Sequence, residues 1–379
     1  MRKRAGTIRR KYLLLAAILA AAVAYVPARR AITAVRLLLV VRQVASGEIP
    51  ASPAVQETRV IRKSGPELLG AVVYRPAGGS PSSGILLIPG VSELGCDHPR
   101  LVSLARALAK SGFFVVTPDI RTFREFQIYP PPLDEISFWL HESARLDGGQ
   151  MMRRIGLAGI SFSGTLALIA AGDVQNRGRA AYVLAIGAFE DLMLCSRFWF
   201  DAGPVTVSPG YYPTRYYAKW VLMLAAADLL AEPADRAFVK TALRDLLLQK
   251  AVPAPTDDVT ETGRRWLKLA VLREDASDPE LALNIENRIA ALLYPGLDTG
   301  KSAAAIRCPV FLAHGAYDDL IPPEESIRLQ KRISSAKSYL LISPFLTHTH
   351  PWEKPLDWWT KVKAVCAIFA FFYHLAGVL

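Results

Sequence analysis

The chain has 379 residues, 51% of them hydrophobic, so it can bury a sizeable core and is long enough for one large domain with an insertion. Its net charge of +11 is concentrated in residues 1–42, which hold ten of the 45 lysines and arginines and no acidic residue. The rest of the chain is nearly neutral, which excludes an extended basic face and with it a nucleic-acid partner. The four cysteines are widely spaced without a CxxC pair, which argues against a metal site and a disulfide framework.

The first predicted element is an apolar run of seventeen uncharged residues, Tyr12–Ala28. As a helix it would be roughly 26 Å long, the short end of what crosses a bilayer. We predict that residues 1–45 form an N-terminal membrane anchor or a cleaved signal segment, since small residues at 22–24 offer a cleavage site; a hydrophobic helix without a membrane role is the third alternative. A second apolar run, Ala31–Ala45, contains arginines and is predicted to lie on the membrane surface. The bases before the first run predict a membrane-associated body on the non-cytoplasmic side.

Residues 46–190 are predicted to form the first part of an α/β core, because short apolar runs alternate with helical patterns. The predicted strands are Val55–Arg62, Glu67–Tyr74, Ile85–Ile88, Phe113–Thr117, Ile155–Ala158 and Tyr182–Ile186. The predicted helices are Arg100–Lys110, Asp134–Met152 and Thr165–Gly172. We expect Asp97 to cap the first of these helices, with Pro99 in its first turn.

Residues 191–305 break this alternation and are predicted to form an inserted helical cap. The alternative is a helical subdomain that does not contact the functional site. Residues 306–379 are predicted to complete the core with two strands, Val310–Ala313 and Tyr339–Ile342. The uncharged stretch Ala364–Leu379 is expected to be a helix that packs on the sheet, with a second membrane contact as the alternative.

A serine with small neighbours lies in the sequence GISFSG, residues 159–164, between a predicted strand and a predicted helix. A serine on such a sharp turn is held in a strained, exposed position, and the helix N-terminus favours negative charge that develops there. We therefore predict that Ser161 is a nucleophile rather than a structural turn residue. The sequence departs from the G-x-S-x-G pattern because Ser163 replaces the second glycine.

Acyl transfer also needs backbone N–H groups that bind an oxyanion. One is expected from Phe162, the residue after the nucleophile. The other is expected from Val91, in a loop after an earlier strand where Gly90 allows close approach of the backbone.

An acid and a base follow the last two predicted strands. The segment HGAYDDLIP, residues 314–322, supplies Asp318, which we expect to orient a histidine; Asp319 and Asp191 are alternatives. The base is expected to be His348, thirty residues further along, with His350 as the alternative.

With these motifs in the order Ser161, Asp318, His348, the chain resembles the α/β-hydrolase superfamily from about Val55 to Leu379. HGAYDDLIP is similar to the HGxxDxxVP pattern of that family. The resemblance implies an α/β-hydrolase fold with a mostly parallel, doubly wound sheet of eight strands, an inserted helical cap and no cofactor. It does not imply a substrate, because this fold hosts many activities.

The sequence therefore favours a carboxyl-ester hydrolase with Ser161, Asp318 and His348 as its triad and Val91 and Phe162 as its oxyanion donors. The predicted partners are a small-molecule ester, which a membrane tether would make lipid-like, and the membrane itself. An acyltransferase with the same triad is the alternative among enzymes. A non-catalytic binding protein of the same fold is the alternative outside them. The sequence leaves the oligomeric state open.

Overall fold

A computed structural model gives the structure of the protein. It describes residues 25–44, 55–78, 81, 83–146, 155–200, 214–271, 278–293, 296–334, 336–346 and 356–379.

The centre of the fold is a sheet of eight strands in the order β1-β2-β4-β3-β5-β6-β7-β8. Strands β1 and β2 form an antiparallel hairpin whose second strand also runs antiparallel to β4, and every later pair is parallel. The bounds are β1 Val55–Ser64, β2 Glu67–Pro76, β3 Gly84–Leu87, β4 Phe114–Pro118, β5 Ile155–Ile160, β6 Ala180–Ile186, β7 Val310–Gly315 and β8 Ser338–Ser343. This strand order is that of the α/β-hydrolase fold, which confirms the predicted fold class and the eight predicted strands.

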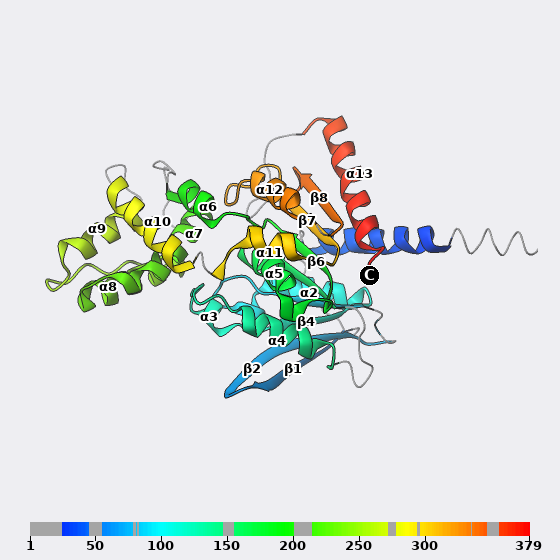
Figure 1. Cartoon of the computed structure of the whole chain (residues 1–379), viewed down its shortest axis with the longest axis horizontal. Coiled ribbons are helices and arrows are strands. Elements are labelled where there is room, and N and C mark those ends of the chain that lie inside the picture. Colours follow the sequence, from blue (N-terminus) through cyan, green and yellow to red (C-terminus); the bar gives the residue numbers. More distant parts are fainter. Residues whose placement is uncertain are drawn as a thin grey trace, which may run out of the picture.

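Both faces of the sheet are covered, because successive residues of its strands point to opposite sides. Leu86 and Ile88 pack into one apolar cluster, whereas Ile85 and Leu87 pack into the other. The first face carries α4 (Leu133–Ser143), α5 (Phe162–Gly172) and α12 (Glu324–Arg332), and the second carries α2 (Pro99–Lys110) and α13 (Trp358–Leu375) (Figure 1). Strands buried on both sides give the continuous apolar runs that the sequence shows.

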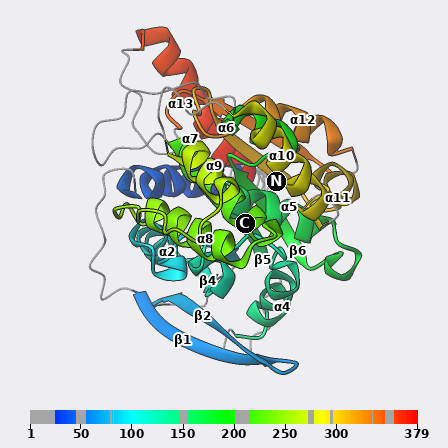
Figure 2. The same ribbon diagram turned by 90° about the vertical axis from the view of Figure 1, so that its left-hand side faces the viewer.

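A group of helices follows β6 and gathers beyond one end of the strands: α6 (Leu192–Phe200), α7 (Thr214–Ala226), α8 (Pro233–Leu247), α9 (Glu261–Ala270) and α10 (Pro279–Leu293). Seen from that side, α7, α8 and α9 lie in front of the strand ends (Figure 2). We call these five helices the cap. The next helix, α11 (Thr299–Ala305), falls in the range predicted for the cap, but it packs against α5 and α12.

Residues 25–44 form a helix whose apolar stripe packs on the body of the protein (Figure 1). Ala34, Leu37 and Val40 are buried, and Arg30 lies against Gly377 at the end of the chain. Among the described residues no helix is long and apolar enough to cross a bilayer. This finding contradicts the predicted transmembrane anchor and membrane localisation. The arginine-containing run was assigned to a membrane surface, but its buried residues pack on the protein, whereas Ile32, Val35 and Leu39 are exposed. Most of the run Tyr12–Ala28 lies outside the described residues.

Two predicted helix boundaries also need correction. Helix α2 begins one residue later than a cap at Asp97 would place it, because His98 is the N-cap and its Nδ1 accepts a hydrogen bond from the Arg100 N–H. Asp97 instead ends the short 3-10 helix η1 (Gly95–Asp97) and pairs with two arginines. Helix α4 ends at Ser143, earlier than predicted.

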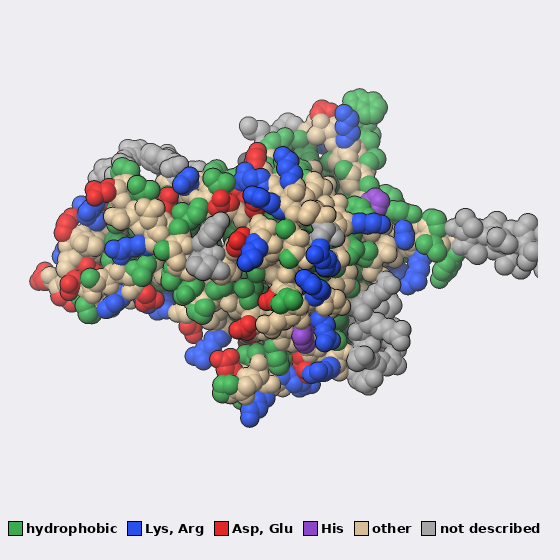
Figure 3. Space-filling view, in the orientation of Figure 1, with side chains coloured by type: hydrophobic (Ala, Val, Ile, Leu, Met, Phe, Trp, Pro, Cys, Tyr) green, Lys and Arg blue, Asp and Glu red, His purple; other side chains and the backbone are tan. Residues whose placement is uncertain are grey.

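Acidic and basic side chains are interspersed on the face of the molecule that Figure 3 shows, over the cap as well as over the core. On that face the surface agrees with the near-neutral charge of the chain beyond residue 42.

Candidate active site

Ser161 occupies a strained turn between β5 and α5. Its φ of 60° and ψ of −130° lie in a region that non-glycine residues rarely adopt, at a cost of about 1–3 kcal/mol. The turn is held by the Ser161 N–H, which donates to the carbonyl of Ile186 at 2.7 Å. Within the described residues the Ser161 hydroxyl has no hydrogen-bond partner, so it is available to a ligand or to the parts of the chain not described. This is the backbone that the GISFSG sequence predicts.

Small residues around Ser161 are required by contact distances. A Cβ on Gly159 would lie 2.3 Å from the carbonyl oxygen of Ser163, and a Cβ on Gly164 would lie 3.0 Å from that of Gly159. Ser163, which departs from the expected glycine, is fully buried, and its hydroxyl donates to the carbonyl of Pro89. The departure therefore adds a tie between the nucleophile turn and the loop after β3, which the sequence alone did not reveal.

The two predicted oxyanion donors come from neighbouring strands. Phe162 is the first residue of α5 after β5, and Val91 follows β3, which pairs with β5. In the part of the chain that the structure covers, neither the Val91 N–H nor the Phe162 N–H has an acceptor. The Phe162 N–H is one of the donors that the start of every helix leaves free, and Ser163 ties this turn to the loop that leads to Val91, so both N–H groups are available to an anionic oxygen. A Cβ on Gly90 would meet nothing within 4 Å, so the protein itself does not demand glycine there.

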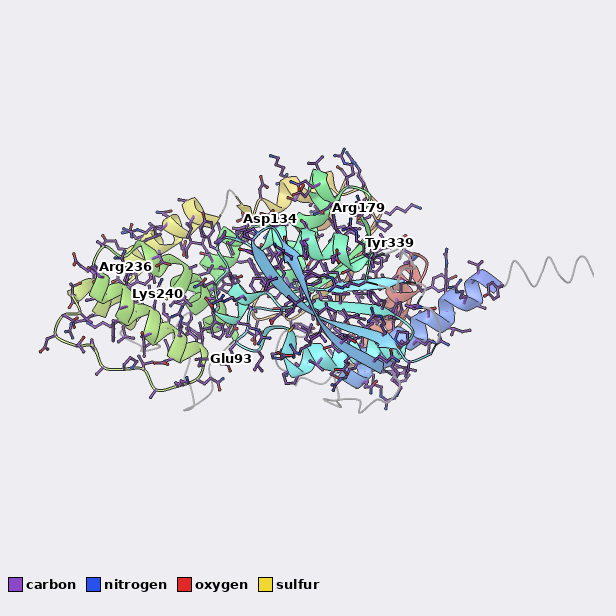
Figure 4. The ribbon with its side chains drawn as sticks, turned by 90° about the horizontal axis from the view of Figure 1, so that it is seen from below. Glu93, Asp134, Arg179, Arg236, Lys240 and Tyr339 are labelled. Carbon is purple, nitrogen blue, oxygen red and sulfur yellow. The ribbon has the colours of Figure 1, made fainter. Side chains whose placement is uncertain are left out.

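Arg124, at the end of α3 (Arg121–Arg124), holds the loop after β3 in place. Its guanidinium donates to the carboxylate of Asp119 after β4, to Asp97 at 2.7 Å and to the carbonyl of Glu93 at 3.3 Å. The hydrogen bond to Asp119 is the main cause that raises the pKa of Arg124. Figure 4 shows Glu93 where the core meets the cap. No local motif in the sequence pointed to this arginine.

Asp318 is almost fully buried in the loop after β7, with 3% of its side chain exposed. Its Oδ1 accepts hydrogen bonds from the N–H groups of Leu320 and Ile321, both at 2.9 Å. The His314 Nε2 lies 3.6 Å from Oδ2 and also 2.8 Å from the carbonyl of Ile321. Because a carbonyl only accepts, Nε2 carries the proton, and Nδ1 can accept from the Ser326 hydroxyl at 2.6 Å.

The alternative acids have other surroundings. Asp191 caps α6, since its Oδ1 accepts from the N–H groups of Met193 and Leu194 at 2.8 and 3.3 Å. Asp319 is exposed. The geometry therefore favours Asp318 as the acid.

His348 and His350 both lie outside the described residues, but the chain that leads to them is in place. The carbonyl oxygen of Leu346 would lie 2.4 Å from a Cβ on Gly315, and the Ala316 N–H donates to the carbonyl of Ser343 at 2.9 Å. The loop after β8 thus begins in contact with the loop that carries Asp318.

Helices α6 and α7 of the cap contact both loops. The Trp199 indole N–H donates to the carbonyl of Leu320 at 2.6 Å, and the Tyr217 hydroxyl donates to the carbonyl of Val91. The ring of Phe162 stacks on Phe189 and lies 6.0 Å from Phe123, so the surroundings of the nucleophile turn are aromatic.

Lys219 of α7 is buried inside the cap, with 5% of its surface exposed. Its ammonium lies 5.2 Å from the centre of the Phe200 ring and 5.9 Å from that of Tyr216. Across the described ranges it has no hydrogen-bond acceptor and no carboxylate partner. Burial lowers the pKa of Lys219 from 10.5 to about 8.

A hollow of about 330 Å³ lies elsewhere, between the C-terminal end of α5 and α11, where its lining includes Gly172, Asp298 and Lys301. Ser161 is at the opposite end of α5. The Asp298 carboxylate accepts a hydrogen bond from the Lys301 N–H as the cap of α11, so the carboxylate at this hollow already has a structural role.

No protein-family model matches the chain, and no curated protein matches it. Solved structures of similar fold include an uncomplexed acylaminoacyl peptidase from Pyrococcus horikoshii, at 14% identity and a TM-score of 0.45, over 79% of this chain and 38% of that one. Another is the esterase Est22, at 15% identity and a TM-score of 0.46, over 91% and 86%. A third is a 2,6-dihydroxy-pseudo-oxynicotine hydrolase, at 14% identity and a TM-score of 0.49, over 85% and 68%. The chain spans less than half the length of the peptidase. The fold assignment rests on the strand order.

Proposed function

We propose that the protein is a serine hydrolase that cleaves carboxylic esters. The observation that carries this proposal is the strained backbone of Ser161 beside two unbonded N–H groups, those of Val91 and Phe162. Backbone strain persists where the surrounding structure over-determines it, and such positions concentrate at functional sites. A structural turn serine would not need the strain.

In the proposed reaction each of these groups has one role. The Ser161 oxygen attacks the ester carbonyl carbon while its proton passes to His348, and the negative oxygen is bound by the N–H groups of Val91 and Phe162. When the C–O bond breaks, the alcohol leaves with the proton from His348 and the acyl group stays on Ser161. Water then attacks the acyl-enzyme by the same steps and releases the carboxylic acid. Asp318 orients the imidazole and stabilises its positive charge.

The substrate side of the proposal rests on the aromatic lining. The ring of Phe162, beside Ser161, is partly exposed and contacts the buried rings of Phe123 and Phe189, which favours an apolar acyl or alcohol group. A lipid-like substrate was expected only because of the membrane tether, and that support is gone.

Labelling with a fluorophosphonate probe tests the activity, because the probe reacts with an activated serine and not with an inert one. We expect wild type to be labelled at Ser161 and to hydrolyse short p-nitrophenyl esters. Ser161→Ala should lose labelling and about 10⁴–10⁶ of the rate, while Ser111→Ala, at the far end of α2, should keep both. A folded wild type that is not labelled would instead indicate a binding protein. Product analysis with added alcohol would show whether water is the preferred acceptor.

A further inference from the structure

The peptide group between Leu320 and Ile321 links the cap to Asp318. Its carbonyl oxygen accepts from the Trp199 indole N–H at 2.6 Å, and its N–H donates to the Asp318 Oδ1 at 2.9 Å. Trp199 and Leu320 are both buried, so this contact is shielded from water. Hydrogen bonds in such a chain polarise one another and fix the plane of the peptide between them.

The peptide group between Val91 and Ser92 is held in a similar way. Its carbonyl oxygen accepts from the Tyr217 hydroxyl, and its N–H donates to the carbonyl of Phe123 at 3.1 Å. The Tyr217 ring is itself held edge-on by Phe126, at 6.2 Å between ring centres. The N–H of Val91, the expected oxyanion donor, lies one peptide before this one, so its direction depends on the same backbone.

We propose that Trp199 and Tyr217 are positioning residues of the cap. They fix the geometry of the loop after β7 that carries Asp318 (the acid loop) and of the loop after β3 that carries Val91 (the oxyanion loop). This inference rests on the proposed function, because it needs Asp318 and Val91 in the roles given above. Neither side chain is assigned a contact with substrate. Each acts through a backbone group that a catalytic element depends on.

Ordinary cap packing is the competing explanation, and the cap supplies its own control. The Trp220 indole N–H donates to the carbonyl of Ala270 at 3.0 Å, in a contact between α7 and α9. Trp220 is as buried as Trp199 and its hydrogen bond is of the same kind, but its acceptor lies inside the cap. Loss of the Trp220 bond should therefore lower stability without moving a catalytic loop.

The test compares Trp199→Phe, Tyr217→Phe and Trp220→Phe in the full chain by ester hydrolysis, fluorophosphonate labelling rate and thermal unfolding. We expect the first two to lower kcat and the labelling rate by roughly 10-fold each, with KM changed by less than about 3-fold, because the lost bond acts on the reacting geometry. Trp220→Phe should keep kcat within about 2-fold despite a similar loss of stability. Tyr217→Phe should also weaken a trifluoromethyl ketone, whose adduct with serine carries the oxyanion, by the same factor as kcat.

Should Trp199→Phe unfold the protein, the isostere 3-benzothienylalanine at position 199 keeps the ring and removes only the N–H. If wild type is labelled and both loop variants keep wild-type kcat, the inference is overturned while the proposed function stands. Equal kcat losses in all three variants would also overturn it, in favour of general packing. A wild type that is never labelled would overturn the proposed function, and this inference with it.

Discussion

A side chain at Gly315 should displace the loop after β8, and one distance gives the size of that displacement. A Cβ at this position would lie 2.4 Å from the carbonyl oxygen of Leu346, and an ordinary contact begins at 3.4 Å. Both atoms are held by backbone, since Gly315 ends β7 and Leu346 follows β8. Gly315→Ala should therefore move the loop after β8 by about 1 Å, because a misplaced loop is less costly than a broken sheet.

A shift of that size matters because His348 comes two residues after Leu346. A misplacement of about 1 Å in a catalytic group can cost on the order of 100-fold in rate. We expect Gly315→Ala to lower kcat for a short p-nitrophenyl ester by about that factor, while the fluorophosphonate labelling rate falls in parallel.

The matched control is Gly78→Ala, because a Cβ on Gly78 would meet nothing within 4 Å. Thermal unfolding of both variants separates loss of fold from loss of geometry. A Gly315→Ala enzyme that folds and keeps more than half of the wild-type kcat would refute the reasoning, because the loop after β8 would then tolerate the displacement.

Three further predictions concern titratable groups. Asp318→Asn should lower kcat by about 10⁴, since an amide leaves the histidine in the wrong tautomer, whereas Asp191→Asn should stay near wild type because asparagine also caps helices; the reverse ranking in ester hydrolysis would move the acid. His348→Ala should inactivate the enzyme and His350→Ala should be milder, which the same assay checks; an active His348→Ala enzyme would reject that base. Lys219→Met should raise the free energy of unfolding by up to about 3 kcal/mol at pH 7, since the pKa of the buried lysine is lowered to about 8. As the pH rises from about 8 to 10.5, the unfolded state binds more protons than the folded state, so the wild type becomes more stable and the advantage of Lys219→Met should shrink. Denaturant unfolding of both proteins at pH 7 and pH 10 measures this advantage, and an equal advantage at both pH values would contradict the prediction.

The sheet could be predicted from the sequence because its signals are local. A strand covered on both faces is a short apolar run, as Val115 and Val116 show at 0% exposure, and helices between such runs have their own period. Boundaries depend on finer contacts. His98 caps α2 because its ring nitrogen accepts a hydrogen bond from a free N–H at the start of the helix. The sequence alone does not show that this histidine, and not the carboxylate of the residue before it, is the N-cap.

In the candidate site, the turn at Ser161 could be predicted from the sequence, because a serine between small residues on a strand-to-helix turn is a local pattern. Asp318 belongs to a similar short motif, which already favoured it over Asp191, and the hydrogen bonds of the two carboxylates agree with that choice. The contacts of Trp199 and Tyr217 join residues 121 and 126 positions apart, and no periodicity encodes such pairs. The role assigned to these two residues therefore had to wait for the structure.

The helix over residues 25–44 shows why the membrane prediction was wrong. An apolar stripe interrupted by arginines predicts that an apolar surface covers it, but it does not predict whether that surface is protein or membrane. Here protein covers one side of the helix, because Leu37 and Val40 join the cluster that includes Phe371 of α13, while Ile32 and Leu39 stay exposed. The arginines reach solvent or the end of the chain, as Arg30 does at Gly377, and so do not oppose this packing.

The cap and the sheet hold the candidate site from opposite sides, and their contributions differ in kind. From the sheet side, Arg124 and Ser163 hold the loop after β3, because the Arg124 guanidinium donates to the carbonyl of Glu93 and the buried Ser163 hydroxyl donates to the carbonyl of Pro89. From the cap side, each tie is a single neutral donor, Tyr217 or Trp199. A neutral hydrogen bond contributes about 1 kcal/mol, but Leu192, Cys195 and Trp199 of α6 are buried in the same apolar cluster as α4 and α5, so apolar burial contributes more than these two bonds to holding the cap on the core.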